Sequence, residues 1–152
     1  MKKSLILLLL LITTMSFSSS SLEPRSPEWE KARALWLKTH PVCAICGSTK
    51  LVQVHHVMVF HRHPEKELDQ TNYVTVCTSK SWGYNDHLLL HGGNFQLENP
   101  WSKEDAERLH VILDPKYIKA HTSREADDYI KMMFARIKKY NCDTYQFRCS
   151  KK

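Results

Sequence analysis

Four histidines in the middle of the sequence have the type and the spacing needed to hold a divalent ion and to activate water. His55 and His56 are adjacent in a valine-rich stretch, and His87 and His91 lie four residues apart. Side chains alternate along a strand, so one histidine of the adjacent pair can reach a metal while the other points toward a water. Histidines four apart share one face of a helix and can bind one ion together. A histidine base with one divalent ion can carry out the hydrolysis of a phosphodiester.

Asn72 stands between the two histidine pairs and offers a way to orient the base. A hydrogen bond from its side chain or backbone can hold the ring and fix which nitrogen accepts a proton. Each feature has a simpler interpretation by itself, because a His-His pair is most often a surface feature and the spaced histidines can be solvated residues beside Leu88–Leu90. The zinc protease motif is excluded, since leucine rather than glutamate follows His87. The combination favours the catalytic interpretation.

The five cysteines divide into two groups by their spacing. Cys43 and Cys46 form a C-x-x-C pair followed by glycine, which is the form of a zinc knuckle, and Cys77 is a candidate third ligand. Cys142 and Cys149 close a short loop near the C-terminus. They are either a disulfide of an oxidising compartment or two unrelated thiols.

The apolar pattern predicts the elements that must position these residues. A helix is expected from Trp29 to about His40, after a Ser-Pro sequence typical of a helix start. Two β-prone runs flank a polar connection, and a short helix that ends before Gly92 and Gly93 carries the spaced histidines. The predicted order is strand, loop, strand, helix. The expected strands are 51–60 and 73–77, and the expected later helices are 86–91, 102–113 and 123–140.

From Trp29 to Trp101 the sequence resembles the His-Asn-His (HNH) endonuclease family, whose ββα-metal fold has this order of elements. The ordered histidines, the asparagine and the flanking cysteines carry the resemblance. It implies an α+β fold with a small ββα-metal core and flanking helices. It also implies hydrolysis of nucleic-acid phosphodiester bonds with a histidine general base and a single divalent ion. Shorter matches are His63-Pro64, Leu68-Asp69, Thr71-Asn72 and the Val-Thr-Val-Cys sequence that ends at Cys77.

The resemblance implies a role for each residue of the catalytic site. His56 looks like the general base, and Asn72 looks like the residue that orients it. The implied ligands of the catalytic ion, which would be Mg²⁺, Mn²⁺ or Zn²⁺, are His55, His87 and His91.

The same resemblance implies a separate structural zinc bound by Cys43, Cys46 and Cys77. Members of the family usually place a cysteine directly before the histidine that opens the final helix, and this chain has Asp86 there. Three thiolates with a carboxylate are an unusual structural set. The zinc site is therefore intact, weakened or completed by another group.

The first residues have the layout of a secretory signal, with two lysines, an apolar run from Leu5 to Ile12 and a cleavage site after Ser18. The run is too short to span a bilayer comfortably, which takes about 20 residues, and an uncleaved anchor is the alternative. The mature protein is expected to be secreted or periplasmic and to have no stable membrane association. The expected organisation is a signal peptide at 1–18, a linker at 19–27, the nuclease domain at 28–101 and a C-terminal helical extension at 102–152.

The chain of 152 residues carries a formal net charge of +6, and it would keep +4 after losing Lys2 and Lys3. An excess of positive charge attracts polyanions and adds weak support for a nucleic-acid partner. We therefore expect a metal-dependent endonuclease that acts on DNA in preference to RNA. The first alternative is a zinc-stabilised nucleic-acid-binding module that does not cut. The second is an exported disulfide protein without a metal.

Overall fold

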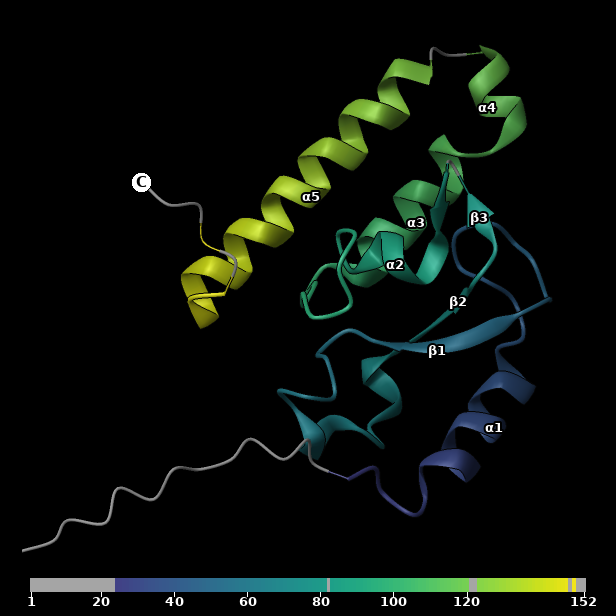
Figure 1. The fold of residues 1–152 in the computed structure, drawn as a ribbon. Helices are drawn as coiled ribbons and strands as arrows, with labels where there is room; N and C mark the ends of the chain where they lie inside the picture. Colours follow the sequence, from purple (N-terminus) through teal and green to yellow (C-terminus); the bar gives the residue numbers. More distant parts are fainter. Residues whose placement is uncertain (1–23, 82, 121–122, 148, 150–152) are drawn as a thin grey trace, which may run out of the picture.

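The computed structural model describes residues 24–81, 83–120, 123–147 and 149, and it has an α+β fold with helices on both sides of a small antiparallel sheet (Figure 1). The expected signal peptide at 1–18 lies outside the described residues. No helix in the described part of the chain is long and apolar enough to cross a bilayer. The elements of the fold are α1 (Trp29–Thr39), β1 (Val52–His56), β2 (Tyr73–Cys77), β3 (Lys80–Ser81), β4 (Tyr84–Asn85), α2 (Asp86–Leu90), α3 (Ser102–Ile112), α4 (Pro115–Ala120) and α5 (Ser123–Tyr145), with 3₁₀ turns at Pro64–Lys66 and Gln70–Asn72.

Strands β1 and β2 form the centre of the fold, and their two faces have different partners. The strands pair antiparallel, with His56 opposite Tyr73. One face carries Tyr73 and packs on Trp29 of α1. The other face carries Val74 and Val76 and belongs to the main core, together with residues of α2, α3 and α5. Figure 1 shows α1 on one side of the strands and α2 with α3 on the other.

Helix α5 is held against the main core by an apolar stripe. Ile130, Met133 and Ile137 recur at spacings of three and four residues, and all three are buried. This periodicity predicts a helix from the sequence, and the structure has one. Full burial of one such side chain stabilises the fold by about 1.5–3 kcal/mol. The helix continues beyond the expected end at 140 and stops at Tyr145.

Glu98 explains why α5 continues past its apolar stripe. The buried carboxylate accepts hydrogen bonds from the hydroxyls of Tyr140 at 3.0 Å and Tyr145 at 2.7 Å, both near the end of α5. It also accepts a hydrogen bond from the backbone N–H of Val59 at 3.2 Å and lies 3.1 Å from Nε2 of His63. Glu98 therefore joins the end of α5 to the loop that follows β1. Because these contacts are polar, no apolar periodicity in the sequence marks the last turns of α5.

Three further features differ from the sequence expectation. Strand β1 ends at His56 rather than at residue 60, because the chain turns into a loop that Asn72 holds by hydrogen bonds. Strands β3 and β4 have two residues each, which is too short for an alternating pattern. Helix α4 begins at Pro115, and the carboxylate of Asp114 accepts a hydrogen bond at 2.7 Å from the backbone N–H two residues on.

The structure joins Cys142 and Cys149 in a disulfide across a separation of seven residues. Replacing both cysteines by serine should lower the free energy of unfolding by about 2.5 kcal/mol, because the cross-link removes conformational entropy from the unfolded chain. Chemical denaturation of the variant and of the wild type, each with and without reductant, measures this difference. The reduced wild type should match the variant. Equal stability of all four samples would contradict the prediction.

Candidate metal centre and adjacent cavity

Three histidines from two neighbouring elements meet on the side of the strands that faces α2 and α3. His55 lies in β1, His87 lies in α2, and His91 directly follows α2. One ring nitrogen of each lies within 4.8 Å of the corresponding nitrogens of the other two. The alternation of the strand turns His55 toward α2, and the helical spacing puts the other two on one face. Local geometry therefore orients each ring, and the packing of α2 beside β1 brings the three rings together.

A chain of hydrogen bonds fixes the protonation of His55. Its Nε2 lies 2.9 Å from Oγ of Ser102, and that hydroxyl donates a hydrogen bond to the backbone carbonyl of Asn99 at 2.6 Å. The serine oxygen must then accept from His55, so the ring carries its proton on Nε2 and a lone pair on Nδ1. This buried Nδ1 has no hydrogen-bond partner among the described residues. A buried lone pair that faces two other histidines is suited to bind a metal.

His87 and His91 are oriented in the same way. Nδ1 of His91 donates to the carbonyl of Leu97 at 2.7 Å, and Nδ1 of His87 lies 3.0 Å from Oε1 of Gln53. Nε2 of each ring is left with the lone pair. Metal-binding histidines typically donate their second N–H to a neighbouring acceptor, which fixes the tautomer and the orientation of the ring. All three rings of the cluster have such a partner.

Burial keeps the three rings neutral. It lowers the pKa of His55 well below its ordinary value, and the nearby rings of His91, His87 and His56 oppose its protonation further. Burial also lowers the pKa of His87 to about 3 and that of His91 to about 4. Neutral imidazole is the form that binds a metal, and three nitrogen donors suit Zn²⁺ or another transition ion better than Mg²⁺. Three protein ligands also leave a coordination position open, as in catalytic metal sites.

His56 follows His55 in the chain but lies against α1. Its ring packs on Trp29 with 4.8 Å between the ring centroids. Nε2 donates to the backbone carbonyl of Glu67 at 3.1 Å, because a carbonyl can only accept, and Nδ1 is left as the basic nitrogen. Burial lowers the pKa of His56 below its ordinary value, so the ring is neutral near pH 7. A neutral ring with a free lone pair can accept a proton.

Asn72 holds the loop rather than the ring of His56. Its Oδ1 accepts a hydrogen bond from the backbone N–H of Met58 at 2.7 Å, and its Nδ2 donates to the carbonyls of Met58 at 3.0 Å and Lys66 at 3.3 Å. Lys66 directly precedes Glu67, whose carbonyl accepts from His56. The sequence suggested a direct bond from Asn72 to the base. The structure instead places the contact one step away, through the loop backbone.

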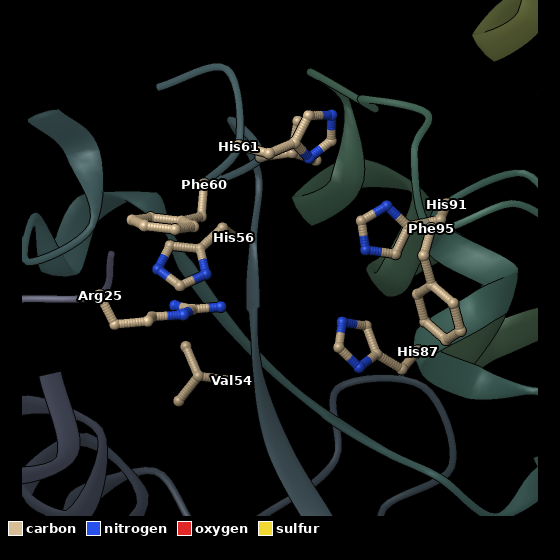
Figure 2. A pocket seen from close by; sticks show the side chains of 9 residues that line it. Arg25, Val54, His56, Phe60, His61, His87, His91 and Phe95 are labelled. Carbon is tan, nitrogen blue, oxygen red and sulfur yellow. The ribbon is translucent and has the colours of Figure 1, made fainter. Parts of the chain in front are cut away.

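A cavity of about 290 Å³ is bordered by His56 on one side and by His87 and His91 on the other (Figure 2). Arg25 and His61 also line it, and the remaining lining residues are apolar. The cavity thus combines one cation, neutral nitrogen donors and apolar walls. Ligand sites usually have this mixture of apolar walls with a few directed polar groups.

A second cluster of candidate ligands lies at the start of α2. Cys43 and Cys46 follow α1, Cys77 ends β2, and Asp86 begins α2, and one ligand atom of each lies within 4.8 Å of the others. Sγ of Cys77 is 3.3 Å from Sγ of Cys46 and 3.3 Å from Oδ2 of Asp86. Sγ of Cys43 is 3.4 Å from the same oxygen. Tetrahedral zinc would separate two sulfurs by about 3.8 Å and a sulfur from an oxygen by about 3.5 Å, so the spacing fits this ion.

The burial of Asp86 is a second observation that fits a metal ion in the cysteine cluster. The residue is fully buried, and its Oδ1 has no hydrogen-bond partner among the described residues. A buried carboxylate without a cation beside it costs several kcal/mol, in order of magnitude. Burial raises the pKa of the Cys43 and Cys46 thiols to about 11, so they keep their protons until a metal displaces them. A divalent ion would compensate the charge of the carboxylate and of the thiolates together.

The residues that orient the rings belong to none of the motifs in the sequence. Ser102 and Gln53 hold two of the ligand histidines, the carbonyl of Glu67 holds the base, and Arg25 lines the cavity. These partners lie between 11 and 47 positions away from the histidines in the sequence. A lone serine, glutamine or backbone carbonyl carries no motif, so nothing in the sequence distinguishes these residues from surface positions.

No protein-family model matches the sequence, and comparisons with curated proteins and with solved structures find no match. The described structure has a small ββα-like arrangement, formed by β1, β2 and α2, with two groups of residues that are able to hold a metal ion.

We predict that residue 86 tunes the zinc affinity of the cysteine cluster. Asp86→Cys would supply a fourth thiolate and should bind Zn²⁺ more tightly than the wild type, whereas Asp86→Ala loses a ligand and should bind on the order of tenfold more weakly. Competition with a chromophoric zinc chelator measures both. Asp128, an exposed carboxylate of α5, supplies the matched control Asp128→Ala. If all four proteins bind zinc equally, Asp86 is not a ligand.

We predict that Ser102 acts on metal binding through His55. Ser102→Ala removes the acceptor of the Nε2–H and should weaken the binding of the second equivalent of Zn²⁺ by about 10- to 100-fold. Calorimetry on protein whose cysteine cluster is already loaded measures this step. His87→Ala should abolish it, and Thr144→Ala on the exposed side of α5 should leave it unchanged. An unchanged affinity in a folded Ser102→Ala protein would exclude the orienting role.

Proposed function

We propose that this protein is a metal-dependent endonuclease that hydrolyses phosphodiester bonds in nucleic acid. One observation carries the proposal: oriented histidine nitrogens border the cavity on one side, and Nδ1 of a neutral His56 is available on the other. Hydrolysis of a phosphodiester requires a base for water and positive charge for the phosphate oxygens at separate positions around phosphorus. The two borders of the cavity would supply them.

In the proposed reaction His56 is the general base. Its Nδ1 accepts a proton from the water that attacks phosphorus while the bond to the leaving oxygen breaks. Its Nε2–H stays bonded to the carbonyl of Glu67, which stabilises the ring once it is charged. A divalent ion held by His55, His87 and His91 would supply positive charge to the phosphate oxygens and to the leaving oxygen.

The family that we propose is the HNH endonucleases. The order β1, β2, α2 supports this assignment, because the adjacent histidines end the first strand, Asn72 directly precedes the second, and His87 lies in the helix. The cysteine cluster at the start of α2 adds support as a second group of candidate ligands. The positive net charge favours a polyanionic substrate, and DNA is the substrate that we propose over RNA.

We also propose that the protein acts outside the cytoplasm. The Cys142–Cys149 disulfide supports this, because disulfides persist in secreted and periplasmic compartments and are rare in reducing ones. The lysine and leucine pattern of the first residues supports it independently.

Cleavage of plasmid DNA by the purified protein tests the proposal directly. The wild type should nick the plasmid with Zn²⁺ or Mn²⁺ and lose this activity when a chelator is added. His56→Ala should reduce the rate by about 100- to 10,000-fold, the usual contribution of a general base, while the metal content stays the same. His40→Ala is the matched control, because His40 is an exposed histidine outside the cavity.

Two results would overturn the proposal. Full activity in His56→Ala would remove the base from the mechanism. No cleavage of DNA or RNA by folded, metal-loaded wild type would favour a nucleic-acid-binding module that does not cut, and a shift of DNA in a gel would identify that alternative.

A further inference from the structure

Arg25 lies at the cavity although it precedes α1 and falls in the segment that the sequence suggested to be a linker. Figure 2 shows its guanidinium beside His56, on the side of the cavity opposite His87 and His91. The side chain is about half exposed, at 47%. Arg25 is thus in place to contact a ligand in the cavity.

The position of Arg25 is fixed by contacts with three other segments. Nη1 donates to Oε1 of Glu67 at 2.9 Å, and the carboxylate of Glu67 is 4% exposed. The backbone N–H of Ser26 donates to the other oxygen of Glu67 at 2.7 Å. The guanidinium lies over the rings of Trp29 at 4.7 Å and Phe60 at 4.3 Å. A planar cation held against two rings loses little further freedom when it binds a ligand.

The same glutamate holds both Arg25 and the proposed base. The side chain of Glu67 binds Arg25, and its backbone carbonyl accepts from Nε2 of His56. Glu67 therefore links the position of the cation to that of the base. A guanidinium has five N–H donors in a fixed plane, so donors remain after the bond to Glu67. No acidic side chain is among the described residues that line the cavity, and the carboxylate of Glu67 contacts Arg25 from outside this lining.

We propose that Arg25 binds the phosphate of the substrate, with its remaining N–H groups directed at a non-bridging oxygen of the bond to be cut. The proposal rests on the proposed nuclease function and adds a substrate-binding residue to it. Guanidinium matches phosphate geometrically by paired hydrogen bonds. The segment before α1 is then part of the active site and not a linker.

A purely structural role is the alternative, in which Arg25 ties the segment before α1 to Glu67. The two roles differ in what they change. A tie affects stability, whereas a phosphate contact affects the affinity for nucleic acid and its dependence on salt, because each neutralised phosphate releases counterions.

The test measures binding of a fluorescein-labelled 12-nucleotide DNA, single-stranded and duplex, to zinc-loaded protein in the His56→Ala background, so that the DNA is not consumed. Adding Arg25→Ala should raise the Kd about tenfold and reduce the slope of log Kd against log salt by about one. Arg25→Lys keeps the charge but not the planar fork and should lose less affinity. Arg33→Ala is the matched control, because Arg33 is on α1 and its ion pair with Glu30 is exposed.

The outcomes separate the two proposals. Equal Kd values and salt slopes for the Arg25→Ala and Arg33→Ala proteins, with Arg25→Ala lowering only the melting temperature, would establish the tie and overturn phosphate binding. If Arg25→Ala does not fold, the comparison of Arg25→Lys with Arg33→Lys decides in the same way. If the His56→Ala protein binds neither DNA, the Arg25 proposal falls. Cleavage by the wild type then decides separately whether the nuclease proposal falls with it.

Discussion

Helix α2 presents side chains to both candidate metal clusters. The elements packed around it must therefore fix both its position and the orientation of its axis. Its first residue, Asp86, turns into the cysteine cluster, while His87 and His91 turn toward the first strand. Successive residues of a helix project roughly 100° apart, so a five-residue helix serves both clusters only if its axis is fixed. At its far end Gly92 has φ +61°, and a side chain there would approach Ile137 of α5 to 3.1 Å. Helix α5 therefore closes over the end of α2.

The part of the chain after residue 101 contributes directly to the site. Ser102 of α3 fixes the tautomer of His55, and the backbone carbonyl of Asn99 accepts a hydrogen bond from the serine hydroxyl. Tyr140 and Tyr145 of α5 bind Glu98, which in turn holds the backbone of the loop after β1. The helices that the sequence suggested to be an extension thus support both the ligand histidines and the loop beside the base. A division of the chain at 101 would separate groups that are in contact.

Elements with a strong local pattern could be predicted from the sequence. The Tyr73–Cys77 strand has the expected bounds, and α1 and α5 start where the sequence places them. The two helices owe their pattern to apolar residues at helical spacing, and the strand owes its pattern to a run of β-prone residues. The hairpin of β3 and β4 and the last turns of α5 could not be predicted in this way. They depend on contacts with distant residues, such as those of Glu98, and a contact of this kind leaves no period in the sequence.

The sequence by itself determined how the candidate ligands are arranged within each short segment, because strand alternation, helical spacing and a C-x-x-C turn are local geometric properties. The resemblance to the HNH family implied which segments come together, and the tertiary structure brings them into two clusters. Only the tertiary structure decided which nitrogen of each ring is free, since that depends on hydrogen bonds to residues as far as 47 positions away. It also decided that Arg25 belongs to the cavity. Its ion pair with Glu67 spans 42 positions, and local spacing carries no information over that separation.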